Sequence, residues 1–310
     1  MLDITIEKDL LLFQDYKKCL SYLNSIDDEN LSYPSDPVNF HIYTEIKTVK
    51  ELLCVESFLA TQNLEKTRLI LWSDYDVSDN SLLEPYKELI DFRVYSPEEE
   101  TKGTVLENCK EWVAVEDSKH YMKSGVLRFL VTHKYGGVWA DMDMVFLRDL
   151  KPILDQEWAY MWGSELDFCG FGPCAAIMSI HKDSLHSNLC MQEIVNSKPA
   201  ADSTVLDHVL LAKVYTKKRF TVFPSTFFNT EWQLNTTYVN DIKHYNSGGL
   251  GTQIESGWFE KNQFSSYLFE GAFAWHWHNS SYKNHRIEDG SKFDILMKLN
   301  KKALKQKGIL

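Results

Sequence analysis

The chain has 310 residues, of which 44% are hydrophobic and 25% are charged, and its formal net charge at pH 7 is −11. A chain of this length can bury one large α/β core, whereas its acidic balance excludes nucleic acid as an expected partner, because phosphate binding needs a basic surface. No apolar stretch reaches the roughly 18 residues that a membrane span needs, so no integral membrane segment is expected in this chain.

The N-terminal region is predicted to form short helices. Its apolar residues make an interrupted face: Leu10, Leu11, Phe13, Cys19, Leu20 and Leu23. Pro34 and Pro37 break this region before Val38 to Ile42, which has the composition of a first strand. We therefore predict a single catalytic domain over residues 1–310, with 1–36 as an N-terminal helical elaboration.

Helices and strands then alternate. Leu52 to Leu64 fits a helix, Thr67 to Trp72 fits a buried strand, and Phe92 to Tyr95 fits another short strand. Such alternation predicts an α/β fold with a mostly parallel sheet and helices on both faces. Sheets of this kind bind ligands beyond the carboxyl ends of their strands.

The most informative segment runs from residue 123 to residue 150. Helical spacing relates Val126, Phe129, Leu130 and His133, and a Gly-Gly pair separates this helix from a short apolar strand at 138–140. Asp141 and Asp143 follow the strand. In an extended chain both carboxylates point to one face, while Met142 and Met144 point into the core.

Two carboxylates on one face repel each other unless a cation lies between or beside them. Oxygen ligands with open positions suit Mn²⁺ or Mg²⁺, and such ions commonly hold phosphates as well. The segment therefore predicts a site for a metal-bound phosphate ester. The alternative is a turn that contains two acidic residues by chance, since loops are rich in aspartate.

This segment resembles the glycosyltransferases whose sugar-binding region contains a D-x-D motif, which include α-1,4-galactosyl- and α-1,6-mannosyltransferases and, more distantly, the clostridial glucosylating toxins. Their pattern is S-D-x-x-R followed by G-G-x-Y-x-D-x-D, and this chain reads SGVLR from Ser124 and GGVWADMD from Gly136. Gly125 replaces an aspartate and Trp139 replaces the tyrosine. The resemblance implies a donor-sugar contact for Arg128 and leaves the sugar open. Trp139 is predicted either to contact the sugar or base or to lie in the core.

A second element of the same family, H-x-W-x-x-S-W, resembles the C-terminal stretch that begins at His276, with His278, Ser281 and Tyr282 at the next three positions of the pattern. The resemblance implies that this stretch returns to the metal and the donor phosphates. We expect His276, Asn279 and Ser281 to complete the metal shell and Tyr282 to contact the donor. A structural pair of histidines is the alternative.

The resemblance also implies a GT-A type fold and a retaining reaction. Asp143 is then the direct metal ligand, and Asp141 binds the metal through water or holds the ribose and donor sugar. Tyr43 stacks on the base or is a strand tyrosine, and Trp72 shapes the base pocket. Asp207 lies under the anomeric carbon or is a surface aspartate of the helix predicted at 202–210.

These observations predict a metal-dependent retaining glycosyltransferase that uses a nucleotide-diphosphate sugar and a hydroxyl acceptor on a glycan or protein. UDP is favoured over GDP because more of the family uses it. The alternative is a catalytically idle nucleotide-sugar- or glycan-binding protein. This alternative arises because the chain departs from the family motifs at Gly125 and Tyr282. A metal-dependent phosphoesterase would need ligands grouped for two cations, and the sequence shows no such group.

The compartment is predicted to be cytoplasmic, or luminal for a domain trimmed of its anchor. The N-terminus lacks the pattern of a secretory signal, and the six cysteines show no zinc spacing and leave disulfides open. Glycosylation sequons occur at Asn30, Asn235 and Asn279. A glycan at Asn279 would obstruct the donor, which favours a compartment without N-glycosylation.

Overall fold

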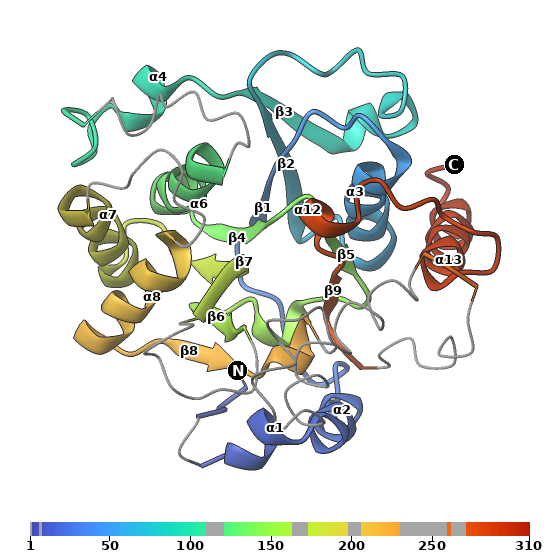
Figure 1. The fold of residues 1–310 in the computed structure, drawn as a ribbon, viewed down its shortest axis with the longest axis horizontal. Helices are drawn as coiled ribbons and strands as arrows, with labels where there is room; N and C mark the ends of the chain where they lie inside the picture. Colours follow the sequence, from blue (N-terminus) through green and yellow to red (C-terminus); the bar gives the residue numbers. More distant parts are fainter. Residues whose placement is uncertain are drawn as a thin grey trace.

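The computed structural model describes residues 2–5, 8–109, 121–162, 173–197, 206–229, 259–261 and 271–310. Its centre is a seven-stranded sheet with the order β3-β2-β1-β4-β7-β6-β8 (Figure 1). The strands are β1 (Val38–Tyr43), β2 (Thr67–Ser73), β3 (Ile90–Val94), β4 (Gly137–Ala140), β6 (Trp158–Met161), β7 (Pro173–Ile180) and β8 (Thr221–Phe223). A second sheet pairs β5 (Met144–Phe146) with β9 (Ala274–His276).

The prediction of a mostly parallel sheet is confirmed. The pairs β1–β2, β2–β3, β1–β4 and β6–β8 are parallel, and β7 is antiparallel to both of its neighbours. The chain runs outward from β1 to β2 and β3 and then returns to β4 on the other side of β1. The carboxyl ends of β1 and β4 therefore flank a point where the strand order reverses, which is where open α/β sheets bind ligands.

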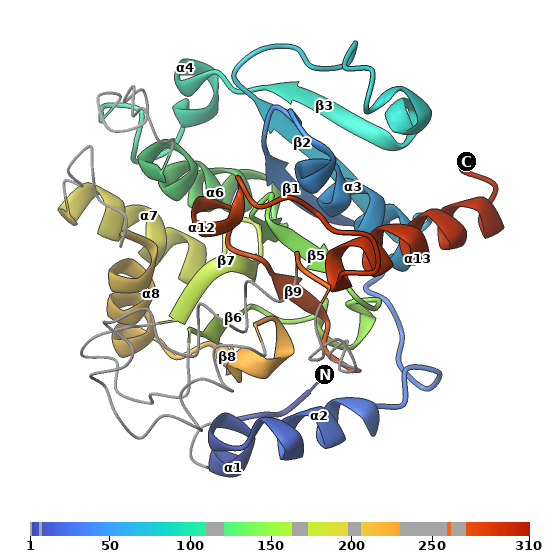
Figure 2. The same cartoon turned by 45° about the vertical axis from the view of Figure 1, so that its right-hand side comes forward.

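Helices cover both faces of the sheet (Figures 1 and 2). One side carries α3 (Val49–Thr61) and α13 (Lys292–Gln306), and the other carries α6 (Tyr121–Tyr135), α7 (Leu185–Ser197) and α8 (Leu206–Lys217). Alternating strand residues fill the two cores. Phe40 of β1 packs on Phe58 of α3, at 4.9 Å between ring centroids, while Trp139 of β4 lies in the opposite core with Leu127 and Leu130 of α6.

The remaining described helices are short. They are α1 (Leu10–Gln14), α2 (Tyr16–Asn24), α4 (Pro97–Thr101), α12 (Asn279–Tyr282) and the 3₁₀ helices η1 (Glu84–Leu89), η2 (Lys151–Ile153) and η3 (Ser225–Phe227). In α1 and α2, which lie in the predicted N-terminal helical region, Phe13, Cys19 and Leu23 are buried, whereas Leu11 is 57% exposed. Tyr22 of α2 stacks on Phe227 of η3, which attaches these helices beside β8.

The helix predicted at 52–64 begins earlier, at Val49. Thr48 and Glu51 form a capping box, in which the Glu51 carboxylate accepts a hydrogen bond of 2.8 Å from the Thr48 N–H. This polar first turn continues the helix beyond the apolar stripe on which the prediction was based.

The Gly-Gly pair before β4 is required by the backbone. Gly136 and Gly137 have φ values of 67° and 110°, and a Cβ on Gly137 would lie 2.2 Å from the main-chain oxygen of Asn39 in β1. Only glycine allows β4 to begin this close to β1.

Five cysteines are free: Cys19, Cys54, Cys109, Cys174 and Cys190. Cys169 lies outside the described residues. Within the described ranges, every helix is too short or too polar to cross a bilayer.

Candidate active site

Asp141 and Asp143 lie in a turn between β4 and β5. The prediction of an extended strand through both residues is wrong, because β4 ends at Ala140 and the Met144 N–H returns to the Asp141 oxygen at 3.0 Å. The Asp141 N–H donates to the Ala176 oxygen of β7 at 2.7 Å, which fixes the start of the turn. Met144 is buried as expected, whereas Met142 is only half-buried. The turn nevertheless brings the two carboxylates together.

His276 meets this turn from the other end of the chain. Because β5 pairs antiparallel with β9, Met144 lies opposite His276. Ligand atoms of Asp141, Asp143 and His276 all lie within 4.8 Å of one another. Two carboxylates and one imidazole at this spacing fit a divalent cation such as Mn²⁺ or Mg²⁺. Three of the predicted site residues thus converge.

Asp143 is held from three directions by the C-terminal stretch. Its Oδ1 lies 3.2 Å from His276 Nε2, and its Oδ2 accepts a hydrogen bond of 2.7 Å from the Asn279 N–H. Its main-chain oxygen accepts another, of 3.0 Å, from the Trp277 N–H. Asn279 therefore contacts Asp143 through its main chain, while the side chain of Ser281 lies outside the described residues.

Asp141 is held by Trp139, which replaces the tyrosine of the family pattern, and by Arg128, which matches the pattern. Its Oδ1 accepts a hydrogen bond of 2.7 Å from Trp139 Nε1 and lies 3.2 Å from the Arg128 guanidinium. Arg128 also donates to the Ala175 oxygen at 2.8 Å, and its side chain is only 8% exposed. The structure thus places Arg128 on a metal-site carboxylate, and it places Trp139 in the core with its indole N–H directed at the site.

The two carboxyl groups have opposite pKa shifts. Burial raises the pKa of Asp141 to about 6, because the opposing charge of Arg128 only partly compensates. Burial would also raise the pKa of Asp143, but the neighbouring His276 reverses this and holds it well below its usual range. Asp143 is therefore the carboxyl group of the pair that stays ionised to lower pH.

An aromatic wall stands beside the carboxylates. The His276 and His278 rings lie 3.9 Å apart between centroids, although β9 ends at His276. Trp162, just after β6, meets His278 at 5.5 Å and His208 of α8 at 5.1 Å, both edge to face. Trp162 and His208 were not predicted. The alternation of Trp158, Tyr160 and Trp162 in the sequence was the available signal for Trp162.

A polar group of Tyr43, Asp74 and Lys123 lies at the carboxyl ends of β1 and β2 and at α6. Asp74 accepts a hydrogen bond of 2.8 Å from the Tyr43 hydroxyl through Oδ1 and contacts Lys123 Nζ at 2.8 Å through Oδ2. Trp72 is only 1% exposed, and its indole N–H donates to His41 Nδ1 at 3.1 Å. Trp72 is therefore a core residue beneath this edge, and Asp74 and Lys123 are its polar groups.

Two further predicted site residues lie in α12 and α8. Tyr282 is 4% exposed and stacks on Phe259 in the core. Asp207 lies in α8, but its side chain is outside the described part of the chain.

Residues 50–160 match the protein family described as "Glycosyltransferase sugar-binding region containing DXD motif". This range runs from α3 to β6 and includes β2, β3, β4 and the D-x-D turn, whereas β1 precedes it. No curated protein sequence matches the chain.

Solved glycosyltransferase structures resemble the whole fold. The glycosyltransferase GlyE of Streptococcus pneumoniae aligns with a TM-score of 0.53 at 10% identity over 88% of this chain, which spans 63% of the GlyE chain. PaToxG glycosyltransferase aligns with a TM-score of 0.44 at 12% identity, over 96% of this chain and 98% of its own. Mouse xyloside xylosyltransferase 1 aligns with a TM-score of 0.46 at 11% identity, over 78% of this chain and 98% of its own. Residues 50–160 therefore resemble a DXD-containing glycosyltransferase sugar-binding region, and the fold of the chain is of the GT-A type.

Proposed function

We propose that the chain is a metal-dependent retaining glycosyltransferase that transfers a sugar from a UDP-sugar to a hydroxyl group of a glycan or protein. The observation that carries this proposal is the convergence of Asp141, Asp143 and His276 within 4.8 Å at the end of β4. The family match and the fold support sugar transfer, and the resemblance to retaining enzymes supports the stereochemistry.

The donor set suits Mn²⁺, or Mg²⁺, with coordination positions left for phosphate oxygens. When bound, such a cation neutralises the charge that develops on the departing nucleoside diphosphate. Asp143 supplies an ionised carboxylate that His276 and the Asn279 N–H hold in one orientation. Arg128 and Trp139 orient Asp141 in the same way.

The remaining groups divide the site into two sides. Tyr43, Asp74 and Lys123 lie at the carboxyl ends of β1 and β2 and at α6, where they suit a nucleoside. Trp162 and His278 lie beside the carboxylates, where an aromatic surface suits the sugar. In the proposed reaction the acceptor oxygen bonds to the anomeric carbon as the bond to the diphosphate breaks, and the acceptor proton passes to the departing diphosphate.

A hydrolytic glycosidase fits the geometry less well. Such enzymes place two carboxyl groups on either side of the bond that breaks. Asp141 and Asp143 instead converge on one point with a histidine. The idle nucleotide-sugar-binding protein shares the same site, and turnover distinguishes it from the enzyme.

The test is a screen of UDP- and GDP-sugars for Mn²⁺-dependent nucleotide release by the wild type and by Asp143→Asn. We expect release from a UDP-sugar that the substitution reduces by at least about 100-fold, since it removes the ionised anchor of the cation. Asp91→Asn is the matched control, because Asp91 lies on the edge strand β3 and pairs only with Arg93 among its described neighbours.

Mn²⁺-dependent UDP binding without release, with or without added acceptors, would favour the idle binding protein. Equal release by Asp143→Asn and the wild type would refute the site assignment.

A further inference from the structure

Lys50 is a buried amino group in the first turn of α3. The residue is 6% exposed, and its Nζ donates to the main-chain oxygens of Tyr282 at 2.8 Å and Lys283 at 3.2 Å and to that of His285. These three carbonyls lie at the C-terminal end of the one-turn helix α12 and directly after it. A single side chain thus satisfies carbonyls that a helix end leaves without partners.

Aromatic rings enclose the same amino group. Nζ lies 4.3 Å from the centroid of the Phe259 ring and 5.8 Å from that of Trp277, distances at which a cation is attracted to the ring face. Burial lowers the pKa of Lys50. A cation in the first turn of a helix also opposes the helix dipole. The position is therefore costly for α3 itself, and the contacts that compensate are those to the C-terminal stretch.

The other end of α12 contacts the metal-site turn. The Asn279 N–H, at the start of α12, donates to Asp143 Oδ2 at 2.7 Å, and the Trp277 N–H donates to the Asp143 oxygen at 3.0 Å. Between these two residues His278 has a φ of 55°, a left-handed conformation that is unfavourable for a non-glycine residue. Residues 277–285 therefore need external contacts to keep this path, and Asp143 and Lys50 hold its two ends.

We propose that Lys50 is a positioning residue of the metal site. Its amino group fixes the C-terminal end of α12, and α12 in turn holds the Asn279 N–H against Asp143. This inference rests on the proposed function, because the carboxylate that Lys50 positions is the proposed metal ligand. Lys50 acts at a distance and touches no ligand of the cation.

The chain contains a matched control for this idea. Lys307 Nζ donates to the main-chain oxygens of Leu59 and Gln62, each at 2.9 Å, at the opposite end of α3. Burial lowers its pKa as well. Lys50→Met and Lys307→Met each remove an amino group that caps backbone carbonyls and keep the apolar stem, although Lys50 is buried and Lys307 is exposed. Only the first removes a contact to the segment that holds Asp143.

The experiment measures the Mn²⁺ dissociation constant by calorimetry, together with Tm, for the wild type, Lys50→Met, Lys50→Arg and Lys307→Met. We expect both methionine variants to lower Tm, but only Lys50→Met to weaken Mn²⁺ binding, by about 10- to 100-fold, as is typical when a group that orients a metal ligand is lost. Lys50→Arg should recover most of the affinity, because a guanidinium also donates to several carbonyls. If Lys50→Met does not fold, Lys50→Gln serves in its place.

Two results would overturn the inference. Mn²⁺ binding by Lys50→Met equal to that of the wild type, or equal weakening in Lys50→Met and Lys307→Met, would show that Lys50 only stabilises the fold. These results leave the proposed function intact as long as the wild type binds Mn²⁺ and Asp143→Asn does not. Absence of Mn²⁺ binding by the wild type would instead refute the proposed function and this inference together.

Discussion

At the scale of single residues, Gly137 decides how closely β4 approaches β1. A Cβ at this position would lie 2.2 Å from the Asn39 oxygen, and the φ of 110° is unfavourable for any other residue. We expect Gly137→Ala to lower the free energy of unfolding by roughly 3 to 5 kcal/mol, because the clash is with backbone and β4 must shift. Urea unfolding measures the change.

Gly103→Ala is the control for this prediction. Gly103 also has a positive φ, of 76°, but a Cβ there meets nothing within 4 Å. Gly103→Ala should lower the free energy of unfolding only by the backbone strain, about 1 kcal/mol. Equal losses in the two variants would contradict the explanation by close strand approach.

Arg128 shows how a residue gains its partner only in three dimensions. Its place in the family pattern implied a donor-sugar contact, but the fold puts its guanidinium 3.2 Å from Asp141 and against the Ala175 oxygen of β7. Residue 175 is distant in sequence, and no local pattern relates it to residue 128. The identity of an arginine near the site was predictable, whereas its hydrogen-bond partners were not.

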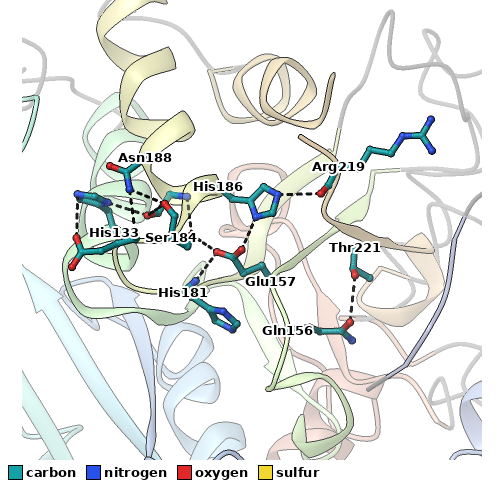
Figure 3. Close-up of polar contacts among 11 residues, drawn as sticks. His133, Gln156, Glu157, His181, Ser184, His186, Asn188, Arg219 and Thr221 are labelled. Carbon is teal, nitrogen blue, oxygen red and sulfur yellow. Dashed lines mark hydrogen bonds and ion pairs between the residues drawn. The ribbon is translucent and has the colours of Figure 1, made fainter. Parts of the chain in front are cut away.

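At the scale of elements, a polar network joins the ends of β6, β7 and α8 at the edge opposite the metal site (Figure 3). Glu157 accepts hydrogen bonds from the His181 N–H at 2.9 Å and from the Ser184 hydroxyl, and its Oε2 lies 2.5 Å from His186 Nδ1. The His186 Nε2 lies 3.1 Å from the Arg219 oxygen. One ion pair thus fixes the start of α7 against two strands.

This network predicts a pH-dependent contribution to stability. The hydrogen bond to Glu157 raises the pKa of His186 above its ordinary 6.5, so its contribution is complete below that value and is lost as the pH rises through the raised pKa. Burial would raise the pKa of Glu157, but hydrogen bonds from His186 and Ser184 lower it below its ordinary 4.5, so its contribution is complete above that value and is lost in acid. The full ion pair is therefore present between these two ordinary values.

Glu157→Gln tests this prediction. The difference in unfolding free energy between the wild type and the variant should be larger at pH 5.5 than at pH 9 by about 1 kcal/mol, the order of a charged hydrogen bond. Urea unfolding at both pH values measures it. A difference that does not change with pH would show that the pair contributes no charge interaction.

At the scale of the whole molecule, stability should be greatest at the centre of the sheet. β1 lies between β2 and β4 and is covered by helices on both faces, whereas α1 has five residues with Leu10 and Leu11 exposed by 40% and 57%. We expect amides of β1 to exchange only through global unfolding and those of α1 through local opening. Hydrogen exchange read by mass spectrometry on peptides from these two regions measures both rates, and equal protection would contradict the prediction.

The sequence by itself did not predict η1 or α4, but it predicted the main helices and strands as far as β4, the mostly parallel sheet, and the approach of the Asp141 and Asp143 carboxylates to each other. These follow from apolar periodicity, glycine pairs and charge, which are local properties. It also predicted that His276 returns to the metal site, but through the family resemblance alone.

Only the tertiary structure decided which groups surround these residues. The pairing of β5 with β9 aligns Met144 with His276, and the capping of α12 by Lys50 joins residues more than 230 positions apart. It also turned Trp72 and Tyr282 into core residues and brought Trp162 and Asp74 to the site. Such contacts depend on the packing of distant elements, whose geometry leaves no periodic signal in the sequence.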